Sequence, residues 1–362
     1  MTPMGRWSIV VAGIAALLAA PFALRALPVD DAGTDAAALL TQVQEAEDHP
    51  YSGYVESQGT LQLPVTDGFT DVGALLGEET RMRVWWRGED RWRVDKLLTT
   101  GEVDLVHDDR GTTRWRYAQD DVQRSPDPDI RLPRTADLLP PSVARMLLDD
   151  VDAEDVERIE ARRVAGIDAP GLRLSPASEQ SSIEHVDLWA DPDSGVPLRV
   201  AVVGKGARTV AFTSEFREFS AATPSAGSVA FRAPPGAEVS FDDVLDIADA
   251  ANQYAPLVPP ASLAGLAKGP QADGAVGVYG AGMTRLLAVP LRDQDAGPLR
   301  EQLARTPGVR EVRRGTVVAL GPLGVMLTGG EGDGGWLLAG TVTGDTLVTA
   351  ARDVTTGTLV RR

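Results

Sequence analysis

Short runs in which apolar and polar residues alternate occupy most of the chain between residues 51 and 220. Each run is bounded by Gly, Asp or Pro, and an alternation of period two places successive side chains on opposite faces of a β-strand. The runs predict strands at 54–63, 80–87, 91–97, 103–107, 113–118, 163–174, 183–190, 198–203 and 209–219. Strands that follow one another this closely predict an antiparallel sheet or part of a barrel.

Two segments repeat apolar residues at helical spacing instead. Residues 34–48 place apolar side chains every three or four positions, and Thr34 or Asp35 can cap the helix that this spacing predicts. A second helix is predicted at 137–159, where an apolar stripe follows a proline-rich entry. A helix with such a stripe must pack against another part of the protein.

A second group of elements is predicted beyond residue 240. Residues 222–236 are rich in Ala, Ser, Pro and Gly, a helix is predicted at 241–252, and three prolines lie within 255–260. The later pattern predicts strands at 276–279, 285–291, 309–314, 316–320, 323–328 and 335–342 and helices at 298–305 and 346–352. This mixture predicts a compact α+β unit.

Charge divides the chain in the same way. The 362 residues carry a net charge of −17, with about +2 on residues 1–26, −21 on 27–250 and +2 on 251–362. We therefore predict a first domain at 33–250, a linker at 251–262, a second domain at 263–352 and a tail at 353–362. The acidic balance argues against attraction to nucleic acid or to an anionic membrane surface.

Residues 7–24 form an uncharged apolar stretch between Arg6 and Arg25. Its 18 residues lie at the lower limit of a spanning helix and above an ordinary signal-peptide core. We favour an uncleaved signal anchor with residues 1–6 in the cytoplasm, and a cleaved signal peptide or a buried core helix are the alternatives. The expected location is the cytoplasmic membrane, with a single span and the bulk of the chain outside the cytoplasm.

Composition removes several kinds of active site. There is no Cys, so the chain has no nucleophilic thiol. The three His are far apart in the sequence, which argues against His-based catalysis or metal ligation. No G-x-S-x-G, H-E-x-x-H or dinucleotide-binding fingerprint occurs. We predict a protein without enzymatic activity, catalytic residues, cofactor or metal.

Aromatic and basic residues are interleaved between residues 81 and 117. Alternation places Trp86 on the opposite face of its strand from Arg81 and Arg83, and Trp92 opposite Arg91 and Arg93. One interpretation is a packed core with outward Arg paired to acids; the other is an apolar face that lines a cavity for an acyl chain or another hydrophobic ligand. The second interpretation predicts cavity-facing side chains at Val84, Trp86, Trp92, Val94, Trp115 and Leu188.

Three further motifs have simpler explanations. Residues 191–195 (Asp-Pro-Asp-Ser-Gly) resemble the start of a calcium loop but lack its later ligands, and a hairpin turn explains them better. The acidic run 149–160 is expected to be a solvated helix face, and the glycine-rich segment 329–335 a hairpin tip rather than a phosphate loop.

The order of several short motifs resembles a known family. Residues 50–54 (PYSGY), 86–94 (WRGEDRWRV), 108–117 (DDRGTTRWRY) and 186–199 follow the pattern of the LolA-like superfamily of envelope proteins. Residues 259–265 (PPASLAG), 278–280 (VYG) and 336–340 (WLLAG) resemble the smaller C-terminal domain of its MucB/RseB branch. Together the motifs cover roughly residues 34–350.

The resemblance implies an α+β fold, with a curved antiparallel half-barrel closed by helices over an apolar cavity and a small α+β domain after it. It also implies a regulator that senses a lipid-like molecule and binds a membrane partner such as an anti-sigma factor. The alternative is a membrane-tethered carrier of lipids or lipoproteins of the LolA type. A retained anchor would be a departure from these relatives, which are typically free after signal cleavage.

Overall fold

The computed structural model describes residues 28–31, 33–61, 70–128, 130–149, 151–241, 247–270, 274–330 and 334–360. Within these ranges no helix is long and apolar enough to cross a membrane. The longest, α7 (Gly344–Gly357), has 14 residues, whereas a span needs about 20. The predicted single-pass location in the cytoplasmic membrane is therefore corrected. The segments on which it rested, 1–6 and 7–24, lie outside the described residues.

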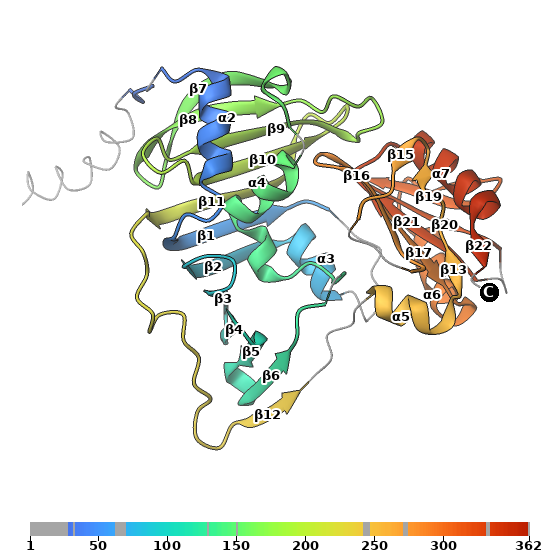
Figure 1. The fold of residues 1–362 in the computed structure, drawn as a ribbon, viewed down its shortest axis with the longest axis horizontal. Coiled ribbons are helices and arrows are strands. Elements are labelled where there is room, and N and C mark those ends of the chain that lie inside the picture. The colour runs from blue at the N-terminus through green and yellow to red at the C-terminus, as the bar shows by residue number, and fades with distance from the viewer. Residues whose placement is uncertain are drawn as a thin grey trace, which may run out of the picture.

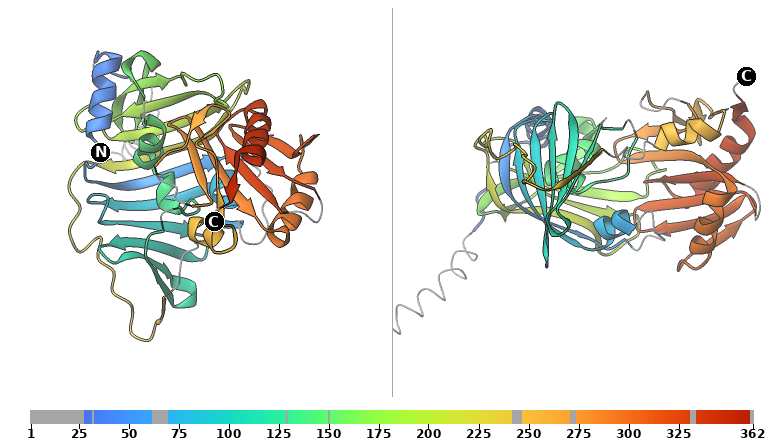
Figure 2. Two further views of the ribbon diagram at one scale, coloured as in Figure 1. Left: turned by 45° about the vertical axis from the view of Figure 1, so that its right-hand side comes forward. Right: turned by 90° about the horizontal axis from the view of Figure 1, so that it is seen from below.

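A twelve-stranded sheet forms the larger part of the fold (Figure 1). Its strands are β1 (Tyr51–Gly59), β2 (Glu79–Trp86), β3 (Trp92–Leu98), β4 (Gly101–Asp108), β5 (Gly111–Arg116), β6 (Asp121–Ser125), β7 (Val156–Val164), β8 (Ile167–Leu174), β9 (Ile183–Ala190), β10 (Pro197–Gly204), β11 (Val210–Ser220) and β12 (Glu238–Phe241). Their order across the sheet is β12-β6-β5-β4-β3-β2-β1-β11-β10-β9-β8-β7. All neighbours are antiparallel except β12 and β6, and the sheet is curved (Figure 2). The predicted curved antiparallel sheet is confirmed.

Short helices cover one face of this sheet, which we call the inner face. They are α2 (Ala36–Glu45), α3 (Thr70–Gly77), the 3-10 helix η3 (Thr135–Leu138) and α4 (Pro140–Leu148). Asp35 caps α2 by accepting a hydrogen bond from the Ala38 amide at 2.9 Å, as predicted. Pro140 opens α4, where its missing N–H costs nothing. Apolar stripes of both helices enter one large core with the sheet.

A six-stranded antiparallel sheet forms the second part of the fold. Its strands, in spatial order, are β16 (Gly277–Ala281), β17 (Thr284–Leu291), β21 (Gly335–Gly340), β20 (Leu323–Thr328), β19 (Gly315–Leu320) and β18 (Arg310–Val312). Helix α7 packs on one face, and α5 (Ile247–Tyr254) and α6 (Asp293–Ala304) pack on the other. The predicted α+β character of this part is confirmed.

Several predicted elements differ from the structure. The run 163–174 is a hairpin, not one strand, because Ala165 and Gly166 both take positive φ angles and turn the chain between β7 and β8. The helix predicted at 137–159 ends at Leu148, and residues 151–155 form a loop that includes a 3-10 turn (Ala153–Asp155) before β7. Among the described residues, four two-residue strands lie outside the main sheets and form two pairs: β13 (Leu257–Val258) with β22 (Leu359–Val360), and β14 (Ser262–Leu263) with β15 (Leu266–Ala267).

The chain around residue 250 also differs from the predicted pattern. The helix predicted at 241–252 is α5, which begins at Ile247, and the residues before it include the edge strand β12. The predicted linker, 251–262, overlaps α5, β13 and β14, and α5 packs against the second sheet. In contrast, the hairpin turn predicted at 191–195 is confirmed, because it joins the antiparallel strands β9 and β10.

Candidate ligand-binding face

Strand register defines the inner face of the large sheet. Val84 lies opposite Val94, and Trp86 lies opposite Trp92, so these four side chains share one face of β2 and β3. All four are at most 5% exposed and belong to the core that includes α2 and α4. The residues that alternate with them along each strand, such as Arg93, point to the opposite face, which we call the outer face. The alternation predicted for these two strands is confirmed.

Leu188 lies on the inner face as well, at the other end of the sheet. It pairs with Val200 on β10 and with Leu172 on β8, and all three are 1% exposed or less. Five of the six predicted side chains therefore line one buried surface. That surface is filled by the side chains of the covering helices, so ligand binding there stays a prediction.

Trp115 is a correction to that set. It lies opposite Asp104 on β4, which in turn lies opposite Asp95 on β3, so Trp115 points to the outer face. It is 6% exposed because Phe231 packs on it there, with ring centroids 6.2 Å apart. The segment after β11 thus buries part of the outer face, and a large buried aromatic residue need not point inward.

An aromatic ladder crosses four strands of the inner face. Tyr51, Trp86, Trp92 and His107 come from β1, β2, β3 and β4, and successive ring centroids are 5.9, 5.7 and 5.3 Å apart with planes within 7° of parallel. They are cross-strand neighbours, which brings their rings within stacking distance. Tyr51 and His107 were not predicted as site residues.

Polar atoms of this ladder are buried without hydrogen-bond partners among the described residues. They are Tyr51 Oη, Trp86 Nε1 and His107 Nδ1, and Arg134 Nε joins them from the guanidinium stacked 4.8 Å above Trp92. Burial raises the pKa of Tyr51, so its hydroxyl stays protonated. An unpaired buried donor costs about 1–3 kcal/mol, and at least two of these atoms can only donate. The row therefore has unused capacity to bind oxygen atoms.

The ladder ends in a charged network at one edge. His107 Nε2 lies 2.5 Å from Asp127 Oδ2, and Asp127 also accepts from Thr112 at 2.9 Å and from Arg134 at 3.0 Å. Burial alone would raise the pKa of Asp127, but the hydrogen bonds from Thr112 and His107, together with the charge of Arg134, hold it below its usual range. Asp127 is therefore ionised in the folded protein at neutral pH.

A groove of about 600 Å³ separates α2 from α4 above the inner face. Both helices line it, and Arg145 of α4 lies at its rim, 3.6 Å from Glu47 and 3.4 Å from Glu89. Few polar contacts attach the covering helices and η3 to the sheet: Gln42 donates to the Pro192 carbonyl at 2.7 Å, and Ser214 to the Leu138 carbonyl at 2.5 Å. Most of the contact between these helices and the sheet is apolar packing.

Helix α4 also contacts the second part of the fold. Asp149, directly after α4, forms an ion pair with Arg285 at the start of β17. Met283, in the β16–β17 turn, is 5% exposed and packs in the core of the first sheet, and its carbonyl accepts a hydrogen bond from Ser181 at 2.8 Å. Helix α4 and the residues before β9 thus both join the first part of the fold to the second sheet.

No protein-family model and no curated protein matches this chain. Among solved structures, the chain is similar to a chain of the Pseudomonas aeruginosa MucA/MucB complex, with 17% identity, 91% of this chain and 100% of that chain covered, and a TM-score of 0.49. A crystal structure of MucB gives 17% identity, 90% and 98% coverage and a TM-score of 0.47. A LolA superfamily protein from Nitrosomonas europaea gives 8% identity, 84% and 91% coverage and a TM-score of 0.20. The likeness is one of fold.

Proposed function

We propose that this chain is a non-enzymatic ligand-binding regulator of the MucB/RseB type. In this proposal the inner face takes up a lipid-like molecule, and the protein binds a membrane protein partner such as an anti-sigma factor. The class of partner comes from the motif resemblance in the sequence. The inner face itself supports the uptake of a ligand.

The observation that carries the proposal is the row of unpaired donors on the inner face. Around this row the face is apolar. The acyl chain of a ligand can therefore take the place of the helix side chains that pack on the sheet. Its ester, carboxylate or phosphate oxygens can then accept from Trp86 Nε1 and Tyr51 Oη. A molecule with an apolar chain and an oxygen-rich head satisfies both requirements at once.

The position of α4 supports a regulatory role. A ligand that displaces α4 from the inner face also moves Asp149 and loosens its ion pair with Arg285. The equilibrium between covered and open states would then change the affinity of the second part for a partner. By linkage, partner binding would change ligand affinity by the same factor.

A direct test uses a dansyl-labelled fatty acid and the full-length protein. We expect saturable fluorescence enhancement that unlabelled palmitate displaces, and a co-purifying acylated mass in native mass spectrometry. Tyr51→Phe should weaken binding several-fold because it removes a donor without changing the ring. Tyr254→Phe is the matched control, since Tyr254 lies on α5 and donates to the Pro290 carbonyl. A clean protein mass together with no saturable enhancement would refute ligand uptake.

A second measurement separates the regulator from the carrier of the LolA type. Asp149→Asn removes the ion pair to Arg285 and leaves the inner face unchanged. If the protein is a regulator, Asp149→Asn should keep its affinity for the labelled fatty acid. The ligand should, however, cause smaller changes in hydrogen exchange in the second part of the fold than it does in the unmodified protein. In a carrier those changes would be absent in the unmodified protein too.

A further inference from the structure

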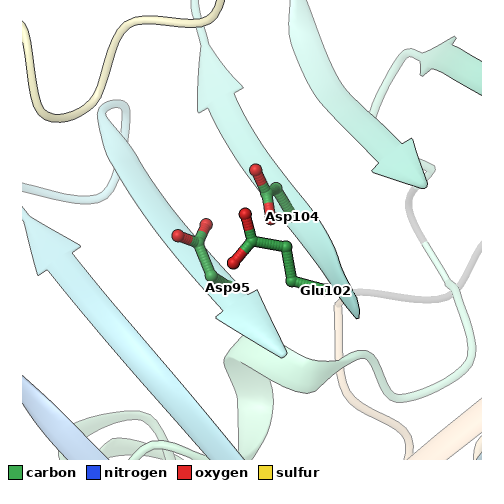
Figure 3. A group of neighbouring side chains, drawn as sticks. All are labelled: Asp95, Glu102 and Asp104. Carbon is green, nitrogen blue, oxygen red and sulfur yellow. The ribbon is translucent and has the colours of Figure 1, made fainter. Parts of the chain in front are cut away.

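Three carboxylates converge on the outer face, away from the candidate ligand-binding face. Asp95 on β3 lies directly opposite Asp104 on β4, and Glu102 lies two residues before Asp104 on the same side of β4. One oxygen of each carboxylate lies within 4.8 Å of the others. Figure 3 shows the three groups pointing toward one another.

Burial makes this arrangement costly. Asp95 and Asp104 are each 3% exposed, and like charges directly opposite each other on neighbouring strands destabilise a sheet. Arg93 donates to both, to Asp95 Oδ1 and to Asp104 Oδ2, at 2.6 Å each. With three carboxylates ionised, this one guanidinium leaves two negative charges uncompensated. A divalent cation carries the charge that is missing.

One oxygen of the group has no partner. Asp104 Oδ1 is the only carboxylate oxygen among the described residues that is buried without a hydrogen bond. Other buried acids have their partners: Asp191 accepts from the amide and the hydroxyl of Ser194, and Glu215 pairs with Arg199 and Arg217. The side chain of Asp104 is 4% exposed, so its free oxygen is shielded from solvent at the point where the three carboxylates meet.

We propose that Asp95, Glu102 and Asp104 bind a calcium ion on the outer face of the sheet. Ca²⁺ takes oxygen ligands at about 2.3–2.6 Å, so two ligands on opposite sides of the ion lie at most about 5 Å apart. The observed separation fits that limit without backbone movement. Mg²⁺ needs about 2.0–2.1 Å and near-octahedral geometry, which requires a tighter group. Glu102 is only half-buried and leaves a route for the ion and for the waters that complete its shell.

The neighbouring residues make the site measurable. Trp115 lies directly opposite Asp104, and the Trp85 ring lies 5.6 Å from the Arg93 guanidinium. A bound Tb³⁺ ion, which occupies calcium sites, would therefore emit when these tryptophans are excited. Burial and the charge of Asp95 raise the pKa of Asp104 to about 7, so the measurement is made at pH 8, where the carboxylate is ionised.

The experiment titrates full-length, chelator-treated protein with CaCl₂ by calorimetry and with TbCl₃ by sensitised luminescence. We expect one equivalent of Ca²⁺, with an affinity in the range of about 10⁻⁴–10⁻³ M that is typical of weak modules, and a melting temperature raised by a few degrees. Asp104→Asn and Glu102→Gln should each lose at least tenfold in affinity. Glu184→Gln, an exposed acid on β9, is the matched control and should bind normally.

Stability separates a cation site from a purely structural ion pair. If the cluster binds Ca²⁺, Asp104→Asn without the ion should unfold no more easily than the unmodified protein, since it removes a repulsive charge. If Asp104→Asn does not fold, the half-buried Glu102→Gln gives the same comparison. Absence of calcium-dependent heat and of terbium luminescence at millimolar ion would overturn the proposal. Equal affinity in both variants and in the control would overturn it as well.

Discussion

Tyr51 and Tyr279 form a matched pair that tests the unpaired donors of the inner face. Both rings are buried, at 1% and 0% exposed. Tyr279 Oη donates to the Pro260 carbonyl at 2.8 Å, whereas Tyr51 Oη has no partner among the described residues. Replacing each with Phe keeps the ring and removes only the hydroxyl. The two substitutions should therefore change stability in opposite directions.

The magnitude follows from the hydroxyl alone. In Tyr51→Phe the stacking on Trp86 and the edge contact with Phe216, with centroids 5.9 and 5.7 Å apart, are preserved. The change removes an unsatisfied buried donor and should stabilise β1 by about 1 kcal/mol. Tyr279→Phe loses a hydrogen bond and should destabilise β16 by about 1 kcal/mol. Each difference corresponds to a roughly five- to tenfold change in exchange rate.

Hydrogen exchange with mass spectrometry measures this locally, because peptides from β1 and β16 report on their own parts of the fold. Exchange in β1 should slow in Tyr51→Phe, and exchange in β16 should quicken in Tyr279→Phe. Faster exchange of β1 in Tyr51→Phe would refute the reasoning, since it would mean that the hydroxyl has a partner in solution. Tyr51 Oη would then have no unused capacity to bind an oxygen atom of a ligand.

Three further outcomes are expected. Leu188→Ala should cost about 2–5 kcal/mol in urea unfolding, because the side chain is 1% exposed in the large core; a loss below 1 kcal/mol would show that the face is not tightly packed. The folded-state pKa of Asp127 is depressed, so its contribution to stability is present above the usual Asp range and is lost as pH falls through the folded pKa; Asp127→Asn should flatten the acid limb of urea midpoints measured from pH 7 to 3. Gly282→Ala should loosen the junction between the two sheets, because φ is +49° and a Cβ would lie 2.4 Å from the Asp149 carbonyl; unchanged proteolysis there would contradict this.

The sequence predicts within-strand alternation well and the pairing of faces less well. Val84 and Trp86 could be placed together because they are two residues apart in one strand. Trp115 could not be placed relative to them, because its face depends on the register of the three strand pairings between β2 and β5. The alternation within 81–95 gave no face for Trp115, and Phe231, more than a hundred residues later, packs on it at the outer face.

Turn chemistry limited the prediction of element boundaries. Ala165-Gly166 makes a tight hairpin with two positive φ angles, of 50° and 84°, but lacks the Asn or Asp that usually marks such a turn. The candidate cation cluster was missed for a related reason. Asp95 and Asp104 are nine positions apart, and only the β3–β4 pairing brings them opposite each other.

The break after α4 explains why one short helix can serve both parts of the fold. If the helix continued through the acidic run to residue 159, Asp149 would lie inside it. Residues 156–159 would then be helical and could not begin strand β7 at the sheet edge. The chain instead leaves the helix at Leu148, and Asp149 reaches Arg285 while the Leu147 and Asp149 carbonyls approach Gly282. The apolar stripe of α4 packs on the inner face, and the end of the helix contacts the β16–β17 turn. Because both contacts belong to one helix of nine residues, we expect a displacement of α4 from the inner face to disturb its contacts with the β16–β17 turn.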